Sequence, residues 1–484
     1  MSALTPQPPE VCMGFVFRHP AVIDPAYVSG SLDNESKASP FSDRNSIERI
    51  RRLSALCYTP TAETLLGIMD EGFRCSLMLS GMFIELLERA DPDLFALLLQ
   101  AATHKHAEPL AETYYHSVIG IFHDAEEYCT QLEMHRSLMQ ELSGRTPSIM
   151  LATDGIFNRT ITAIARDMGF SAIYTDIFGR NTLEINPAGS YHVEGMPVLI
   201  RHCELSDDIA YRFGQVDWVY HPLSPQTYAG WVASIGGGTV HIMVDIEVFG
   251  GRFSAESGIF RFLEGLPAAY ADYGVKTVLP SDTIQSSPPS KQAPEELLNR
   301  SPVAWPVNMF QCTALDALRA AGRWVSDRTT WRRFQSMHLF ESMATTVGSC
   351  GMLLTHRTQS EAHEAFSQYL TALCRFEDEQ GRRVRSKSAA RCLRCVSPDR
   401  AFHFCTPHHR EGFSAHSLEE FLKLMDLASD ECIRHHCKRS DLCNWIRDVI
   451  GDTMLAERIR PLQDRQEIRE VITKRIDQLW NRLK

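Results

Sequence analysis

The stretch VCMGFVFRHP, residues 11–20, begins with an apolar run and ends with the polar residues Arg18 and His19 before a proline. Segments with apolar residues at helical spacing, such as residues 46–57 and 126–142, occur further along the chain. Between such segments, short apolar runs like the first recur at residues 73–79, 148–153, 172–175, 197–201, 240–245 and 276–279. This alternation predicts βαβ units, and therefore an α/β chain built on a parallel sheet or barrel.

Several of the predicted strands end in polar side chains. Arg18 and His19 follow the first run, Asp154 and Asp176 follow runs in the middle of the chain, and Asp245 closes the run at 240–245. In a barrel of parallel strands, active sites lie at the carboxyl ends of the strands. These positions are therefore the first candidates for a functional site.

Composition limits the classes of function. The chain has 484 residues, 44% of them hydrophobic and 23% charged, which is typical of a globular protein with a large core. The formal net charge of −11 argues against nucleic acid or an anionic membrane as the general partner. No apolar run approaches the roughly 18 residues of a membrane span. We see no secretory signal at the N-terminus, and we expect a cytoplasmic protein whose fourteen cysteines are mostly reduced.

Changes in composition divide the chain into segments. Residues 1–280 carry the strand–helix alternation and predict a barrel domain of the catalytic type. Residues 281–294, SDTIQSSPPSKQAP, are typical of a linker. Residues 295–379 have helical patterning, and residues 392–484 predict a small α-rich domain. Between them, residues 380–391 form a basic run that is either a solvated hinge or a contact for phosphate or a partner.

Two carboxylates at the strand ends suggest one kind of chemistry. Cleavage of a glycosidic bond needs one carboxyl group to protonate the leaving oxygen and a second to attack the sugar or activate water. Asp154 and Asp245 come from two different predicted strands and are a possible pair. The alternative is that each is a cap or turn residue, a common role for Asp after a strand.

Several longer stretches carry a resemblance to a known family. They are LAETYYHSV (110–118), LSDDIAYRF (205–213), HPLSPQTYAGW (221–231), SGIFRFLEGLP (257–267) and WRRFQSMHLFESM (331–343). In this order they resemble the α-amylase-like branch of glycoside hydrolase family 57, over about residues 10–375. The resemblance implies an incomplete seven-stranded (β/α) barrel, followed by a helical domain and a small α-rich C-terminal domain. It implies an α-glucan or oligosaccharide partner and no cofactor.

The resemblance also assigns the catalytic positions. In LATDGIFN (151–158), Asp154 stands where the family has its nucleophilic Glu. In VDIEVFGGR (244–252), Asp245 corresponds to the general acid/base, while Arg252 replaces a His. In the family's first motif, Arg18 replaces the leading His. The remaining substrate-binding candidates are supporting polar groups and aromatics for stacking on sugars: His19, Glu112, His116, Glu247, Trp218, Trp231 and His338.

These replacements have physical consequences. Shortening Glu to Asp withdraws a carboxyl group by about 1 Å, and a misplacement of that size can cost roughly a hundredfold in rate. Added positive charge at Arg18 and Arg252 favours the ionised form of Asp245, which opposes its use as an acid. Three hypotheses stay open: a working α-glucan hydrolase or transferase, a lapsed homologue that binds glucan or regulates a partner, and an enzyme for a phosphate- or carboxylate-bearing sugar.

The C-terminal unit has its own resemblance. The stretches PDRAFHF (398–404), SLEEFL (417–422) and RSDLCNWIRDVIGD (439–452) resemble a small accessory domain of uncharacterised function found on carbohydrate-active enzymes. Two close pairs, Cys392 with Cys395 and Cys405 with His408, have ligand types that a tetrahedral zinc site can use. The alternative is a set of buried or scattered free thiols. Oligomeric state stays open.

Overall fold

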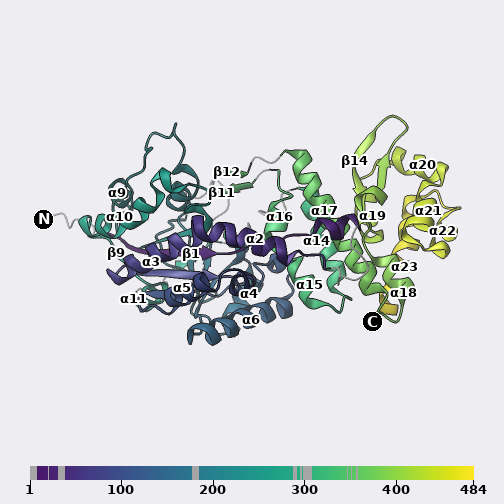
Figure 1. Cartoon of the computed structure of the whole chain (residues 1–484). Coiled ribbons are helices and arrows are strands. Elements are labelled where there is room, and N and C mark those ends of the chain that lie inside the picture. Colours follow the sequence, from purple (N-terminus) through teal and green to yellow (C-terminus); the bar gives the residue numbers. More distant parts are fainter. Residues whose placement is uncertain are drawn as a thin grey trace. The chain divides into compact units, whose positions relative to one another are not determined.

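The computed structural model describes residues 8–19, 21–30, 39–176, 185–286, 291–294, 297, 308–345, 347–349, 352–355 and 358–483. Contacts divide the chain into two compact units. The first comprises Met1–Pro20, Asp43–Pro306 and Thr346–His356. The second comprises Ala21–Ser42, Val307–Thr345 and Arg357–Lys484. Figure 1 shows the elements of both units, coloured along the sequence.

The first unit contains a sheet centred on β1 (Glu10–Phe17). This strand pairs in parallel with β2 (Cys75–Leu79) on one side and with β8 (Thr239–Asp245) on the other. Strand β3 (Ala107–Pro109) extends the sheet beyond β2, and β9 (Lys276–Thr277) also pairs with β1. The register pairs Val16 with Asp245. As a result, the residues that follow β1 leave the sheet beside the end of β8.

A second sheet has the order β10-β6-β7-β5-β4. Its strands are β4 (Ile149–Leu151), β5 (Ala172–Thr175), β6 (Tyr191–Val193), β7 (Met196–Ile200) and β10 (Lys291–Gln292). β4, β5 and β7 are parallel, and β6 is antiparallel to β7. Two isolated parallel bridges, Ala111 with Met150 and Arg201 with His241, join the two sheets.

The predicted α/β class is confirmed, because parallel strands alternate with helices throughout the first unit. Its longer helices are α2 (Asp43–Leu53), α3 (Thr59–Asp70), α4 (Gly81–Ala90), α5 (Pro92–Thr103), α6 (Ala125–Ser143), α7 (Arg159–Asp167), α9 (Pro225–Ser234) and α10 (Ile259–Asp272). Among them α4 packs on α2, and α10 packs on α3 and α9. Residues 281–294, predicted as a linker, include most of helix α11 (Pro280–Ser286) and strand β10.

Local sequence explains where these helices begin and end. Asp91 accepts a hydrogen bond from the backbone N–H of Leu94 at the start of α5, and Pro92 takes the first helical position. Asp124 caps α6 in the same way. At the other end of α6, Gly144 adopts φ 68° and ends the helix.

The second unit is mainly helical. Its first part contains α1 (Pro25–Ser29), α14 (Met309–Gly322), α15 (Arg328–Arg333), α16 (Met337–Glu341) and α17 (Gln359–Gly381). Its last part contains α18 (Lys387–Leu393), the hairpin β13 (Phe402–Cys405) and β14 (Arg410–Ala415), and α19 (Leu418–Met425), α20 (Asp430–Arg439), α21 (Asp441–Trp445), α22 (Thr453–Ile459) and α23 (Arg465–Leu483). Phe402, Phe421 and Trp445 lie in the core of this last part. In the part of the chain that the structure describes, no helix is long and apolar enough to cross a membrane.

The turn after β8 tests how tightly the first unit is packed. Gly250 has φ +88°, and a Cβ there would lie 1.8 Å from the backbone oxygen of Leu56. We expect Gly250→Ala to lower the free energy of unfolding by about 2–5 kcal/mol, from strain and overlap together. Gly144→Ala is the matched control, because Gly144 also has positive φ but meets nothing within 4 Å. It is expected to cost about 1–2 kcal/mol. Calorimetric unfolding of both variants measures the two losses in free energy. Equal losses would contradict the close contact between Gly250 and Leu56.

Candidate active site

The site begins where β1 and β8 end. Arg18 follows β1 directly, and its Nε donates a hydrogen bond to Oδ2 of Asp245 at 2.6 Å. The parallel register explains this contact, because Val16 lies opposite Asp245 and the chain then carries Arg18 past the strand end. Both side chains are partly exposed, 17% for Arg18 and 28% for Asp245. The pair is therefore within reach of a ligand from solvent.

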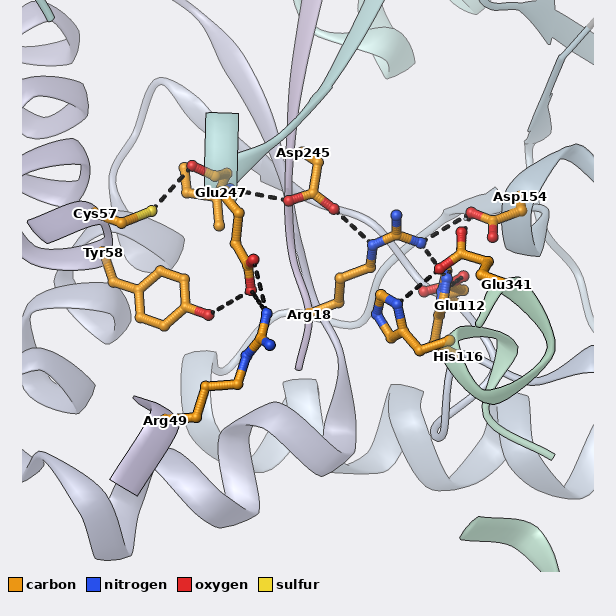
Figure 2. A network of polar contacts seen from close by, with 12 residues as sticks. Arg18, Arg49, Cys57, Tyr58, Glu112, His116, Asp154, Asp245, Glu247 and Glu341 are labelled. Carbon is orange, nitrogen blue, oxygen red and sulfur yellow. Dashed lines mark hydrogen bonds and ion pairs between the residues drawn. The ribbon is translucent and has the colours of Figure 1, made fainter. Parts of the chain in front are cut away.

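Asp154 approaches the same guanidinium from another strand. It follows β4 in a single 3₁₀ turn, η3 (Thr153–Gly155), and adopts φ 43°. A left-handed conformation is uncommon for a residue with a side chain and often marks a functional site. Nη1 of Arg18 donates to Oδ1 of Asp154 at 2.9 Å. Figure 2 shows the Arg18 guanidinium between the two carboxylates, which belong to the two different sheets.

Asp245 has a second partner on its other oxygen. Its Oδ1 accepts a hydrogen bond at 2.9 Å from the backbone N–H of Glu247, and so caps the short turn η6 (Ile246–Val248). Donors on both oxygens stabilise the carboxylate relative to the carboxylic acid. This arrangement therefore favours the carboxylate form of Asp245 over the acid form.

Glu112 and His116 are the buried polar side chains of the site. They lie after β3, and Nδ1 of His116 is 2.6 Å from Oε1 of Glu112. The Nε2 atom of His116 is 3.4 Å from Oδ1 of Asp154 and also contacts Nη1 of Arg18. Burial opposes a charge on His116, but attraction by Glu112 and Asp154 outweighs both burial and repulsion by Arg18, and raises the pKa of His116 to about 10. At neutral pH this imidazole is therefore protonated.

In Figure 2, Glu247 lies on the side of Asp245 opposite to Asp154. Its Oε2 accepts a hydrogen bond from Arg49 at 3.0 Å, and its Oε1 accepts one from the hydroxyl of Tyr58, also at 3.0 Å. Burial and the Glu247 charge both raise the pKa of Tyr58, so this hydroxyl keeps its proton and acts as a donor. Arg49 and Tyr58 thus fix the position of Glu247. No sequence motif marked them, because both lie in segments that read only as amphipathic helix.

A second ion-pair group lies at neighbouring strand ends. Arg201, after β7, donates to Asp176 at 2.9 Å and to Asp207 at 2.5 Å. Asp207 is fully buried. Asp176 was recognisable as a polar strand end, whereas Asp207 is hidden in the stretch 205–213, where no periodicity singles it out. This group links the ends of β5 and β7.

The other predicted residues have different surroundings. Arg252 donates to the backbone oxygen of Ala210 at 2.7 Å and lies over the ring of Tyr211, 4.5 Å from its centroid. His19, which follows Arg18 in the sequence, is buried, with 1% exposure. His338 belongs to α16 in the second unit, where its Nδ1 is 2.8 Å from Oε2 of Glu341.

Trp218 and Trp231 belong to an aromatic group with Tyr220. The ring centroids of the two tryptophans are 5.9 Å apart, and those of Tyr220 and Trp231 are 4.7 Å apart. The rings meet edge to face, an arrangement that stabilises aromatic pairs. Tyr220 keeps 49% exposure. The group therefore combines internal packing with an accessible aromatic ring.

The cysteines proposed as zinc ligands have separate neighbours. The backbone N–H of Cys395 donates to Glu377 of α17, whereas Cys392 lies in the core of the C-terminal part. Cys405 lies near the imidazole of His436, with 3.7 Å between Sγ and Nε2. Among the described residues, no group of three or more His, Cys, Asp or Glu side chains could hold a metal ion.

Comparison with known protein families identifies the class of protein to which this chain belongs. The family model for glycosyl hydrolase family 57 matches residues 15–298 of this chain. The chain therefore belongs to that family. The matched region includes Arg18, Glu112, His116, Asp154, Asp245 and Glu247.

Individual proteins and solved structures also resemble this chain. A Methanocaldococcus jannaschii protein described as "Putative alpha-amylase" is 32% identical over 296 residues, which cover 58% of this chain and 63% of that protein. This chain thus matches less than two thirds of that relative. The branching enzyme of Pyrococcus horikoshii is 11% identical with a TM-score of 0.53, over 77% of this chain and 91% of that one. The branching enzyme of Thermococcus kodakaraensis, solved with glucose, is 10% identical with a TM-score of 0.51 over the same shares. These two structures share the fold.

The charge on His116 makes a prediction for stability. Its pKa is higher in the folded chain, so the protonated form stabilises the fold fully below the unfolded-state value of about 6.5. This stabilisation is lost as the pH rises through about 10. We expect His116→Gln to cost about 3–5 kcal/mol near pH 6, because Glu112 then loses its buried partner. The cost should shrink towards alkaline pH.

Denaturant unfolding of the wild type and His116→Gln across this pH range measures the difference. His363→Gln, at an exposed position, is the control, and its free energy of unfolding should stay close to that of the wild type. A constant gap between the wild type and His116→Gln would mean that His116 carries no extra proton in the folded chain.

Proposed function

We propose that this chain is an α-glucan-active hydrolase or 4-α-glucanotransferase, with Asp154 as nucleophile and Asp245 as general acid/base. The observation that carries the proposal is the meeting of both carboxylates, from two different strand ends, at the single guanidinium of Arg18. Membership of glycosyl hydrolase family 57 supports the reaction class. A retaining mechanism needs two carboxyl groups about 5–5.5 Å apart on either side of the scissile bond.

The chemistry proceeds in two displacements in this proposal. Asp154 attacks the anomeric carbon and forms a glycosyl-enzyme bond, while Asp245 protonates the leaving oxygen. Asp245 then removes a proton from water, or from the hydroxyl of a second sugar, which attacks the same carbon and releases Asp154. Water as acceptor gives hydrolysis, and a sugar hydroxyl gives transfer. Glu112, protonated His116 and Glu247 hold the surrounding charges in place.

The strand pairing supports an incomplete barrel as the scaffold. β1, β2 and β8 continue through β3 to β4 by the Ala111–Met150 bridge. β5 and β7 continue to β8 by the Arg201–His241 bridge. Seven parallel strands among the described residues are thereby connected in a ring, with their carboxyl ends on one side. Asp154 and Asp245 both come from that side.

Exposed aromatic rings are the proposed contact for the glucan chain. Tyr220, with Trp218 and Trp231 packed around it, presents an aromatic surface to solvent. The apolar faces of sugar rings stack on such surfaces, because aromatic side chains offer large, rigid contact areas. His19, Arg252 and His338 are further proposed substrate-binding groups.

A second candidate function is that of a lapsed homologue that binds glucan without turnover or regulates a partner. Its supporting observation is again Arg18. The guanidinium fills the space between the carboxylates and stabilises both in their charged form. A substrate has to displace Arg18 before Asp154 can attack, and Asp245 has to gain a proton. In the binding-only case neither step occurs.

Product analysis with maltoheptaose distinguishes the two candidates. We expect new oligosaccharides after long incubation with the wild type, because both carboxylates are present, and none with Asp245→Asn. Asp154→Glu restores the longer nucleophile and is expected to raise the rate by up to about a hundredfold. Shorter products indicate hydrolysis, and longer ones indicate transfer. Unchanged maltoheptaose with both the wild type and Asp154→Glu would refute the enzymatic proposal.

Arg18→His tests the role of the bridging cation. Removing a charged hydrogen bond that stabilises the resting carboxylates, worth about 1.5 kcal/mol, is expected to raise turnover about tenfold. Arg159→His is the matched control, because Arg159 makes an exposed ion pair with Glu194 in the same unit. It should leave turnover unchanged. Saccharide binding by Arg18→His, measured by calorimetry, without any product would favour the binding-only function instead.

A further inference from the structure

The turn that follows β8 packs against a helical stretch from earlier in the first unit. Arg49 belongs to α2, and Cys57 and Tyr58 end η1 (Ser54–Tyr58), the π-helical turn that joins α2 to α3. η1 packs on the short turn η6, which carries Glu247. Cys57 and Tyr58 are fully buried. A closely packed helical surface therefore lies against the residues just past the end of β8.

Three donors from this surface hold the turn. The thiol of Cys57 donates a hydrogen bond to the backbone oxygen of Ile246 at 3.2 Å. The hydroxyl of Tyr58 donates to Oε1 of Glu247 at 3.0 Å, and Nη2 of Arg49 donates to Oε2 at 3.0 Å. Figure 2 shows these three side chains gathered around Glu247. Both the backbone and the side chain of the turn are thus fixed.

The same turn supplies a donor to Asp245. The backbone N–H of Glu247 donates to Oδ1 of Asp245 at 2.9 Å. Arg18 favours the same ionised form from the other oxygen, whereas the negative charge of Glu247, two residues along the chain, opposes it. The N–H reaches Oδ1 only while the single 3₁₀ turn keeps its shape. A displacement of Glu247 therefore removes a donor from Asp245.

The groups that hold the turn keep their protons. Burial, followed by the charge of Glu247, raises the pKa of both Cys57 and Tyr58. The thiol and the hydroxyl are therefore donors at neutral pH, and Arg49 is charged throughout. In the proposed reaction a substrate displaces Arg18 from Asp245. The donors from α2 and η1 then remain as the support for the turn beside Asp245.

We infer that Tyr58, assisted by Arg49 and Cys57, is a positioning residue that sets how readily Asp245 binds a proton, by fixing the turn η6. Tyr58 acts through Glu247 and not on the reacting atoms. The inference rests on the proposed function, because the proton on Asp245 matters for turnover only if Asp245 is the general acid/base. Removing a donor from a carboxylate favours its acid form, so loosening the turn raises the pH at which Asp245 loses its proton.

Titration of the Asp245 carboxyl carbon by NMR tests the inference without any need for turnover. In protein labelled with carboxyl-¹³C aspartate, the signal of Asp245 is the one missing from Asp245→Asn. We expect it to titrate about half to one pH unit higher in Tyr58→Phe than in the wild type, because one donor to a charged group is weakened. An unchanged titration would overturn the inference.

Tyr27→Phe is the matched control. Tyr27 is also buried, with 1% exposure, and its hydroxyl also donates to a glutamate, Oε1 of Glu379, at 3.0 Å. Both belong to the second unit. This variant loses the same kind of contact and should leave the Asp245 titration unchanged. Equal shifts in Tyr27→Phe and Tyr58→Phe would mean that a general loss of stability causes them, and would refute the positioning role.

Cys57 offers an independent pair of variants. Cys57→Ala removes the donor to the backbone of the turn, and we expect it to move the Asp245 titration in the same direction as Tyr58→Phe. Cys57→Ser keeps a donor at this position and should titrate like the wild type. Equal behaviour of the alanine and serine variants would contradict a role for this hydrogen bond.

The pH dependence of turnover separates the inference from the function on which it rests. With maltoheptaose, the alkaline limb of kcat/KM reports the general acid of the free enzyme. Tyr58→Phe should move this limb upward by the same half to one pH unit, whereas Tyr27→Phe should not. Products from the wild type with an unmoved limb in Tyr58→Phe would overturn the inference alone. A wild type without products would refute the proposed function, and the carboxyl titration would still decide whether Tyr58 positions the turn.

Discussion

The ion pairs of Arg18 hold together side chains from strands that never pair with each other directly. Asp154 follows β4 in one sheet, Asp245 ends β8 in the other, and one guanidinium contacts both. Without a cation there, these two carboxylates and the buried Glu112 would repel each other. Arg18 and protonated His116 oppose that repulsion with two positive charges against three negative ones. The geometry of the site depends on this balance.

The same interactions set a limit on the proposed catalysis. In that proposal Asp245 has to hold a proton and Asp154 has to be reachable, yet Arg18 favours the ionised form of Asp245 and contacts Asp154. Interactions that stabilise the resting site lower activity unless the transition state gains more than the ground state loses. Tight substrate contacts elsewhere, for example at the aromatic group around Tyr220, would have to supply that difference.

Much of the fold was predictable from local pattern, because long buried strands are apolar throughout. The run at 172–175 coincides with β5. The run at 240–245 ends with β8 and starts one residue later than that strand. β3 (AEP), β6 (YHV) and β10 (KQ) were missed, because these short strands contain charged or polar residues and form no apolar run. In the site, strand ends pointed to Asp154 and Asp245, but not to Arg49 or Tyr58. Those two reach Glu247 across about 190 positions of sequence, and only the folded chain brings them there.

In the C-terminal unit, close spacing in the sequence wrongly suggested that Cys392 and Cys395 share one site. Cys392 and Cys395 are close in sequence, but α18 ends between them at Leu393. Cys392, still on the helix, points into the apolar core, and Cys395, already past it, faces α17. The backbone N–H of Cys395 donates to Glu377 of α17, eighteen positions earlier. A helix end rotates successive side chains away from one another, whereas two packed elements bring distant ones together. Which residues lie close together is thus decided by which elements pack, and α17 packs directly against α18.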